Sequence, residues 1–334
     1  MSQPPDNRGP VLFVVFLLLV ALIVVAWGVG QEDAGGAAPV DEPTGTPASS
    51  VGEPAVDEPV ETRAPMPGSD PARPTLPDGG TRVFGGHHFL VAYYGTAQTA
   101  SMGVLGESGP GTMDDRLRRA AAPFRRPGRP LRHVYELIAT IADGRPGPDG
   151  DYSHDIPRAE VRRYVRAAHR NRALLLLDLQ PGRTGFLDVA RRWAWALRDP
   201  WVGLALDPEW RMARGEVPAR TIGRVRAAEV NRTSAWLARL AREEGLPEKL
   251  FVLHQFRVDM VPDIEDVLRR PGLAMVQHVD GFGTRRQKLA TYHAVARPQR
   301  FTMGFKLFYD EDVERMGARA VHALRPQVRF VSYQ

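Results

Sequence analysis

The stretch GLALDPEWRM, residues 203–212, ends a short apolar run with two acids and a tryptophan, Asp207, Glu209 and Trp210. Two carboxylates held a few ångströms apart cannot both ionise easily, so one of them takes a raised pKa. General-acid cleavage of a glycosidic bond uses such a pair, with a protonated acid beside an ionised carboxylate. The alternative is a structural pair that accepts hydrogen bonds from backbone amides in an acidic turn.

The direction in which these acids point depends on the strand that carries them, because successive side chains of a strand alternate between its two faces. One face carries Gly203, Ala205, Asp207 and Glu209, and the other carries Leu204 and Leu206. Small side chains fit the crowded interior of a barrel, and leucines fit an outer surface covered by helices. We therefore expect both acids to point into the barrel.

The elements that would position these residues alternate from residue 81 onward. Short apolar runs predict strands at 89–95, 133–142, 173–180, 201–210, 250–256, 273–283, 301–310 and 328–334. Amphipathic periodicity predicts helices at 113–122, 157–171, 184–198, 221–244, 260–269, 284–295 and 311–323. In the fourth helix, Thr221 is expected to cap the start and Gly245 to mark the end.

Eight strands, with a helix after each of the first seven, are typical of a (β/α)8 TIM barrel, an α/β fold. The alternative is a doubly wound open sheet. That fold would need a glycine-rich phosphate loop after an early strand, and the sequence has none.

Active sites of such barrels lie at the carboxyl ends of the strands, and here those ends are polar. Glu209 is the predicted acid and Asp207 the predicted stabiliser, supported by Asp178 and Asp280. The predicted substrate-binding residues are Tyr93, Tyr94, Glu136, Gln180, Trp210, His254, Gln255, His278, Lys306, Tyr309 and Tyr333. Their polar groups would hydrogen-bond to a sugar and their aromatic rings would stack on it, although a single aromatic also fits an ordinary core.

The two histidines leave a metal-dependent hydrolase open as an alternative, because amidohydrolase barrels take histidine ligands from strands five and six. That family also needs His-x-His at the end of strand one and an aspartate on strand eight. Here His87 and His88 are adjacent and precede the first strand, and the eighth strand reads FVSYQ. We therefore predict no metal ion and no cofactor, with sugar hydrogen bonding as the role of His254 and His278.

The stretch VGLALDPEW, residues 202–210, resembles the strand-four signature of chitinase-like family 18 glycoside hydrolases. It is also similar to the Asp-x-Glu of the family 25 lysozymes, which cleave peptidoglycan. The family 18 resemblance implies that Glu209 protonates the leaving group and that Asp207 supports the acetamido group of the substrate. Val202 and Ala205 stand where family 18 has further aspartates, and the first strand lacks the aspartate of family 25, so an inactive member stays open.

The residues before the barrel have a different composition. Residues 11–27 are seventeen apolar residues without a charge, and the run continues to residue 30, which is long enough to cross a bilayer. We predict a cytoplasmic segment at 1–10, a transmembrane signal anchor at 11–30, a disordered linker at 31–80 and the barrel at 81–334. Arg8 before the span favours an extracytoplasmic barrel at the cell membrane. Secretion after signal cleavage is the alternative.

Charge divides along the same boundary. The net charge of +5 combines about −8 on the linker with about +13 on residues 81–334. A basic domain could attract anionic polymers such as teichoic acids or nucleic acid. However, lysine occurs only at 249, 288 and 306, which indicates an arginine-rich coding bias rather than a phosphate-binding surface, so no nucleic-acid partner is predicted. The chain has no cysteine, so its core alone must hold the fold.

These patterns together predict a membrane-anchored, glycoside-hydrolase-like protein that acts on peptidoglycan or another extracellular polysaccharide. A non-catalytic glycan-binding barrel and a metal-dependent hydrolase are the two alternatives. The chain as a whole also resembles an uncharacterised group of exported actinobacterial proteins, which implies a location and no chemistry. The sequence leaves the oligomeric state and the identity of the sugar open.

Overall fold

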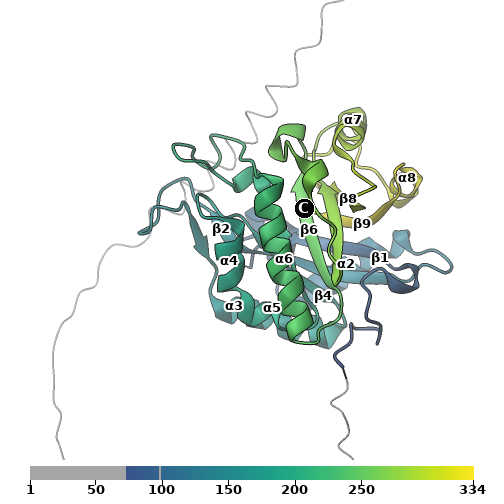
Figure 1. Cartoon of the computed structure of the whole chain (residues 1–334). Coiled ribbons are helices and arrows are strands. Elements are labelled where there is room, and N and C mark those ends of the chain that lie inside the picture. The colour runs from purple at the N-terminus through teal and green to yellow at the C-terminus, as the bar shows by residue number, and fades with distance from the viewer. Residues whose placement is uncertain (1–72, 98) are drawn as a thin grey trace, which may run out of the picture.

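The computed structural model describes residues 73–97 and 99–334, and these residues form a closed barrel (Figure 1). Eight parallel strands pair in the order β1, β2, β4, β5, β6, β7, β8, β9, and β9 pairs back with β1. The strands are β1 (Phe89–Gly95), β2 (Leu131–Ala142), β4 (Leu174–Leu179), β5 (Val202–Leu206), β6 (Lys249–Gln255), β7 (Leu273–Val279), β8 (Thr302–Leu307) and β9 (Val328–Tyr333). The predicted (β/α)8 topology is confirmed, and the open-sheet alternative is wrong.

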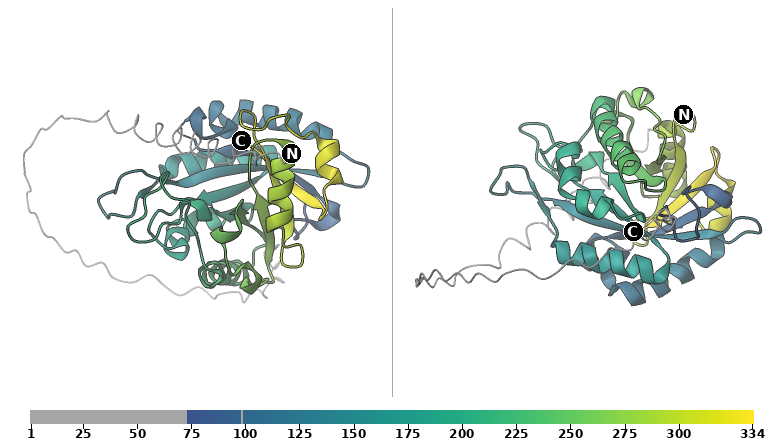
Figure 2. Two further views of the ribbon diagram at one scale, coloured as in Figure 1. Left: turned by 90° about the horizontal axis from the view of Figure 1, so that it is seen from above. Right: turned by 60° about the horizontal axis from the view of Figure 1, so that its bottom comes forward.

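Helices lie around the outside of the ring of strands (Figure 2). They are α2 (Pro110–Ala121), α3 (Arg158–Asn171), α4 (Phe186–Arg192), α5 (Ala194–Leu197), α6 (Ala227–Glu243), α7 (Arg285–Val295) and α8 (Ala318–Ala323). A short strand that the sequence did not predict, β3 (Ser153–Asp155), pairs antiparallel with the end of β2.

The core has two layers, as the alternation of the strands requires. An inner cluster includes Ala205 with Leu176 and Leu250 from the neighbouring strands, whereas Leu204 and Leu206 belong to the outer cluster that packs against the helices. Gly203 also faces inward, because a Cβ at this position would lie 2.4 Å from the Leu250 carbonyl oxygen. The predicted faces of β5 are therefore confirmed up to Leu206.

The helix predicted at 260–269 is wrong. Within the described residues, β6 and β7 are joined by irregular chain and two 3₁₀ turns, η7 (Val258–Met260) and η8 (Ile264–Asp266), and no α-helix covers this side (Figure 1). Pro262 disfavours the helical conformation at Val261. The Asp263 carboxylate accepts a hydrogen bond from the Ala227 amide at 2.8 Å, so this acid caps the start of α6 instead of beginning a helix of its own.

Two predicted boundaries around Glu209 also change. The strand predicted at 201–210 ends at Leu206, and a 3₁₀ turn, η6 (Pro208–Trp210), follows it. The helix predicted at 221–244 begins at Ala227, so Thr221 does not cap it, while Gly245 follows the helix with a φ of 62° as expected. The Gly223 amide instead donates to the Glu209 carbonyl oxygen at 2.6 Å and braces the η6 turn.

The chain joins the barrel at the amino-terminal ends of the strands. Leu76, in the segment predicted as linker, is buried in the inner cluster, and the Trp201 indole donates to the Thr75 carbonyl oxygen at 2.8 Å. The folded part thus begins before residue 81. The predicted cytoplasmic segment and anchor lie outside the described residues, and in the described part no helix is long and apolar enough to cross a membrane.

We predict that Gly203→Ala destabilises the barrel. The added methyl group would force β5 away from the Leu250 carbonyl, and overpacking of this kind lowers the free energy of unfolding by about 1–3 kcal/mol. Urea denaturation measures this change. Gly111→Ala in α2, where a Cβ meets nothing within 4 Å, is the matched control and should not lower stability. An equal loss in both variants would contradict the inward placement of Gly203.

Candidate functional site

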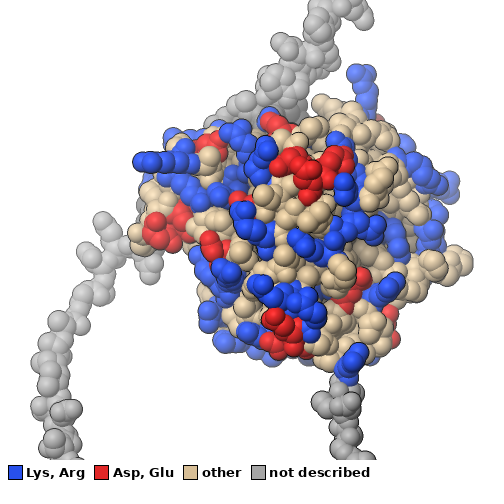
Figure 3. Space-filling view, in the orientation of Figure 1, with Lys and Arg blue, Asp and Glu red and all other residues tan. Residues whose placement is uncertain are grey.

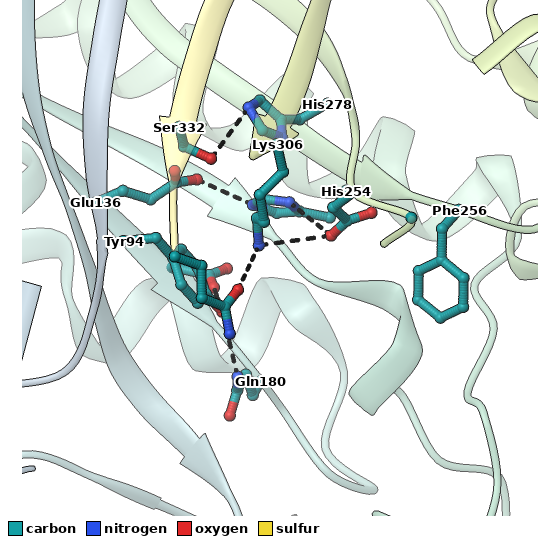
Figure 4. A network of polar contacts seen from close by, with 12 residues as sticks. Tyr94, Glu136, Gln180, His254, Phe256, His278, Lys306 and Ser332 are labelled. Carbon is teal, nitrogen blue, oxygen red and sulfur yellow. Dashed lines mark hydrogen bonds and ion pairs between the residues drawn. The ribbon is translucent and has the colours of Figure 1, made fainter. Parts of the chain in front are cut away.

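Polar side chains collect inside the barrel at the carboxyl-terminal ends of its strands (Figure 4). Along each strand they lie two residues beyond another inward-facing residue. Because every second side chain of a strand points to the same face, they also point into the barrel and toward one another. The buried members are Glu136 on β2, Asp178 on β4, Asp207 after β5, His254 on β6, Asp280 after β7 and Lys306 on β8. Together with Glu209 we call them the carboxylate cluster.

His254 lies between two carboxylates. Its Nε2 is 3.0 Å from Glu136 Oε1, and its Nδ1 is 3.1 Å from Asp280 Oδ2 (Figure 4). Burial by itself would lower the pKa of His254, but its hydrogen bonds to Asp280 and Glu136 outweigh burial and raise this pKa well above the usual value. His254 is therefore a cation whose two N–H groups both donate.

Lys306 is the second buried cation. Its Nζ lies 3.6 Å from Asp280 Oδ2, donates to Gln334 Oε1 at 3.2 Å, and sits 3.7 Å from the centre of the Tyr94 ring. Burial opposes its charge, yet Asp280 and the other nearby carboxylates raise the pKa of Lys306. A lysine must lose its proton to act as a nucleophile, so Lys306 acts here as a fixed positive charge.

Asp280 is the carboxylate that these two cations favour. Burial would raise its pKa, but the charge of Lys306 and the hydrogen bond from His254 lower it below the ordinary value of 3.8. Asp280 is thus ionised at neutral pH. Its second oxygen, Oδ1, is buried and has no hydrogen-bond partner among the described residues.

The pKa values of Asp178 and Asp207 are raised, in contrast to the lowered pKa of Asp280. Tyr94 donates its hydroxyl hydrogen to Asp178 Oδ2 at 2.9 Å, and Gln180 Nε2 lies 3.4 Å from the Tyr94 oxygen. Burial, together with the charge of Glu136, raises the pKa of Asp178. Burial and the charge of Glu209 raise the pKa of Asp207 well above its usual value. In both side chains the surroundings favour the neutral form over the ionised form.

Glu209 differs from the others because it lies at the rim, in the η6 turn, and is partly exposed to solvent. Its carboxyl group makes no hydrogen bond or ion pair with the part of the chain that the structure describes. Protein nonetheless surrounds it on most sides, and this burial, with the charge of Asp280, raises the pKa of Glu209 to about 8. At neutral pH, Glu209 holds a proton and can deliver it to a molecule outside the barrel.

A second histidine completes the interior. Ser332 Oγ on β9 lies 3.3 Å from His278 Nε2, and Gly304 on β8 leaves room for the ring, because a Cβ there would lie 2.5 Å from His278 Cδ2. Burial and the positive charge of His254 lower the pKa of His278 well below its usual value. The sequence analysis missed Ser332, although its spacing of two from the inward-facing Phe330 was the available signal.

The described residues contain no group of three or more His, Asp or Glu side chains that could hold a metal ion. Both ring nitrogens of His254 already face carboxylates, so the metal-hydrolase alternative lacks a ligand set in this part of the chain.

Five of the predicted substrate-binding residues lie away from the polar interior of the barrel. Tyr93, Tyr309 and Tyr333 form an aromatic group with the outward-facing side chains, where the rings of Tyr309 and Tyr333 stack at 5.3 Å. Gln255 faces outward and accepts from Gln277 at 2.7 Å. Trp210 packs with Ala142 and Ala219 in a small separate cluster. The remaining predicted residues are brought together inside the barrel.

Comparisons with known proteins leave the family open. No family model matches the chain, and no curated protein matches it. Among solved structures, it is similar to a trimodular endoglucanase of the GH5_4 subfamily, with 12% sequence identity and a TM-score of 0.43. The similarity covers 74% of this chain and 55% of that one, so the chain spans about half the length of that structure. A likeness this distant carries no inference about activity, and it gives no support to the family 18, family 25 or actinobacterial resemblances.

We predict that the pKa of Glu209 responds to its two charged neighbours in opposite directions. Asp280→Asn removes a negative charge that holds the proton on Glu209, so this pKa should fall below about 8. Lys306→Met removes a positive charge that favours ionisation, so the same pKa should rise. Carbon-13 NMR titration of labelled glutamate, assigned with Glu209→Gln, measures both shifts.

Each variant is first checked for cooperative thermal unfolding. The exposed Glu243 at the end of α6 provides the control, since Glu243→Gln should leave the Glu209 titration unchanged. Shifts of the same sign in Asp280→Asn and Lys306→Met would contradict the electrostatic origin of the raised pKa.

Proposed function

We propose that this barrel is a glycoside hydrolase in which Glu209 is the general acid and Asp280 is the ionised carboxylate that acts with it. One observation carries the proposal: the environment raises the pKa of one carboxyl group to about 8 and lowers the pKa of a neighbouring one. When the surroundings separate the pKa values of two carboxyl groups in this way, one site supplies a protonated acid and an ionised carboxylate at the same pH.

The positions of the two groups fit these roles. Glu209 is at the rim and carries the proton that a departing sugar oxygen needs. Asp280 is deeper, and His254 and Lys306 keep it negative, so it can act on the oxocarbenium-like charge or on an attacking water. The structure-based assignment differs from the sequence prediction, which gave Asp207 the stabilising role, because the raised pKa of Asp207 favours its neutral form.

Asp207 and Asp178 have a different proposed role. Each has one buried carboxyl oxygen without a hydrogen-bond partner among the described residues. Buried polar atoms of proteins are normally satisfied, so an unsatisfied pair in a candidate site is consistent with partners supplied by a ligand. Sugar hydroxyl groups both donate and accept hydrogen bonds, and we propose that they fill these places.

The proposed substrate is a polysaccharide. An extracellular or cell-wall glycan such as peptidoglycan follows from the predicted anchor at 11–30 and the predicted linker, and both remain predictions. The alternative is a barrel of the same design that binds glycan without cleaving it. The two possibilities separate when turnover and binding are measured on the same variants.

We predict that Glu209→Gln abolishes most turnover and retains glycan binding. Loss of a general acid lowers the rate by about 10²–10⁴-fold, while glutamine keeps the size and hydrogen-bonding capacity of the side chain. Reducing-end release from peptidoglycan, chitin and other polysaccharides measures turnover, and co-sedimentation with the same polymers measures binding. Glu243→Gln is the matched control and should behave as the unaltered protein.

If neither the unaltered protein nor Glu209→Gln cleaves any polymer and both bind equally, the barrel is a glycan-binding protein and the hydrolase proposal fails. Turnover that survives in Glu209→Gln would remove Glu209 from the acid role.

The pH profile provides an independent prediction. Because Glu209 must be protonated to act as an acid, kcat/KM should fall as pH rises through about 8. Because Asp280 must be ionised and its pKa is lowered, its titration should cause no loss until the pH drops below the ordinary value of 3.8. A profile that already declines between pH 6 and 7 on the alkaline side would contradict the assignment of Glu209.

A further inference from the structure

A hollow with an arginine-rich lining lies apart from the carboxylate cluster. Its volume is about 1140 Å³, and its charged lining consists of Asp114 and six arginines: Arg118, Arg125, Arg126, Arg129, Arg170 and Arg172. We call it the arginine hollow. Basic residues are scattered over the face of the domain seen in Figure 3, but this hollow gathers six of them around one space.

The arginine hollow is at the end of the barrel opposite Glu209. It is built from Asp114 and Arg118 of α2, residues 170–172 at the end of α3, the turn at 125–130 and the first residues of β2. In a (β/α)8 barrel the helices run back against the strands, so helix ends and strand starts meet at the amino-terminal face. A ligand bound here would leave the carboxylate cluster open.

Most of the positive charge in the hollow is not neutralised. Asp114 is already engaged, with Arg118 Nε at 2.6 Å and the Tyr135 hydroxyl at 2.7 Å. By contrast, the side chains of Arg125, Arg126 and Arg170 make no ion pair or hydrogen bond within residues 73–97 and 99–334.

Local structure accounts for only some of these arginines. Cations favour the carboxyl end of a helix, and Arg118 donates to the Asn171 carbonyl oxygen at 2.6 Å at the end of α3. Arg170 and Arg172 flank the same helix end, and Arg172 also donates to the Pro77 carbonyl oxygen. Arg125 follows η5 (Ala122–Phe124), the 3₁₀ turn that ends α2, so it also lies at a helix carboxyl end. Arg126 and Arg129 lie further along the turn that leads into β2, and no helix end accounts for these two charges.

We propose that the arginine hollow binds an anion that carries neighbouring phosphate groups. Guanidinium groups present paired donors that match phosphate oxygens, and several of them here face one space. Pockets for small ligands have volumes of roughly 300–1,000 Å³, so the hollow has room for more than one phosphate. Among the described residues no Phe, Tyr or Trp lines it, and such rings are the usual stacking platform for bases of single-stranded nucleic acid, so we take the phosphate chain itself as the recognised feature.

The test uses the full chain and tripolyphosphate as the probe, with affinity measured by isothermal titration calorimetry. The double variant Arg125→Ser, Arg126→Ser should weaken binding by about tenfold or more, because two charge-assisted contacts are lost. The control, Arg232→Ser with Arg242→Ser, removes the same charge from exposed positions on α6 and should change affinity less than about twofold. The imidazole signals of His133, which lines the hollow, should shift in NMR spectra on addition of the probe.

The proposal is overturned by no binding of tripolyphosphate, by an equal loss of affinity in both double variants, or by binding of polyglutamate as tight as that of the phosphate chain. A single-stranded oligonucleotide that binds more tightly than tripolyphosphate of equal charge would show that bases are read and would overturn it as well. Neither binding nor its loss bears on the glycosidase proposal, because Glu209→Gln should bind tripolyphosphate as the unaltered protein does.

Discussion

The arrangement inside the barrel depends on one electrostatic constraint, the balance of buried charge around Lys306 and His254. Five carboxyl groups share the carboxyl-terminal end of the barrel with these two cations. Removing an unpaired charge from water is costly, so only as many carboxylates can ionise as the cations compensate. Two cations can compensate two carboxylates, and Asp280 is one of these because it contacts both cations, at 3.6 and 3.1 Å. Its charge then keeps the proton on Glu209, so the protonated Glu209 and the ionised Asp280 have a common cause.

Much of this arrangement could be predicted from the sequence, because it rests on alternation. Apolar runs in the sequence locate the strands. Once one residue of a strand is known to point inward, alternation predicts the rest, and it gives Asp178, Asp207, His254 and Asp280 as inward-facing. The same rule, applied strand by strand, would have separated Tyr94 from Tyr93. The substrate-binding residues were chosen because they lie near the carboxyl end of a strand, without regard to the face on which their side chains lie. The chosen set therefore contained Tyr93, Tyr309, Tyr333 and Gln255, whose side chains point outward.

Other features depend on contacts between distant segments, which a single sequence does not show. Asp263 lies within the helix predicted at 260–269, but its carboxylate caps the start of α6 across the loop, and turns replace the predicted helix. The arginine content could be counted but not located: residues 118, 125 and 170 come from three different elements. The direction of each pKa in the cluster likewise follows from the three-dimensional neighbours of a carboxyl group, not from its position along a strand.

The place where the chain joins the barrel has a mechanical consequence. Leu76 is inserted among the inward side chains, and Asp78 forms an ion pair with Arg132 at 2.7 Å, so the first described residues are fixed to the floor of the barrel. A domain or anchor attached before residue 73 would therefore load the amino-terminal face of the barrel, whereas Glu209 lies at the opposite, carboxyl-terminal face. An attachment at that end would therefore leave the opposite face, which carries Glu209, open to solvent.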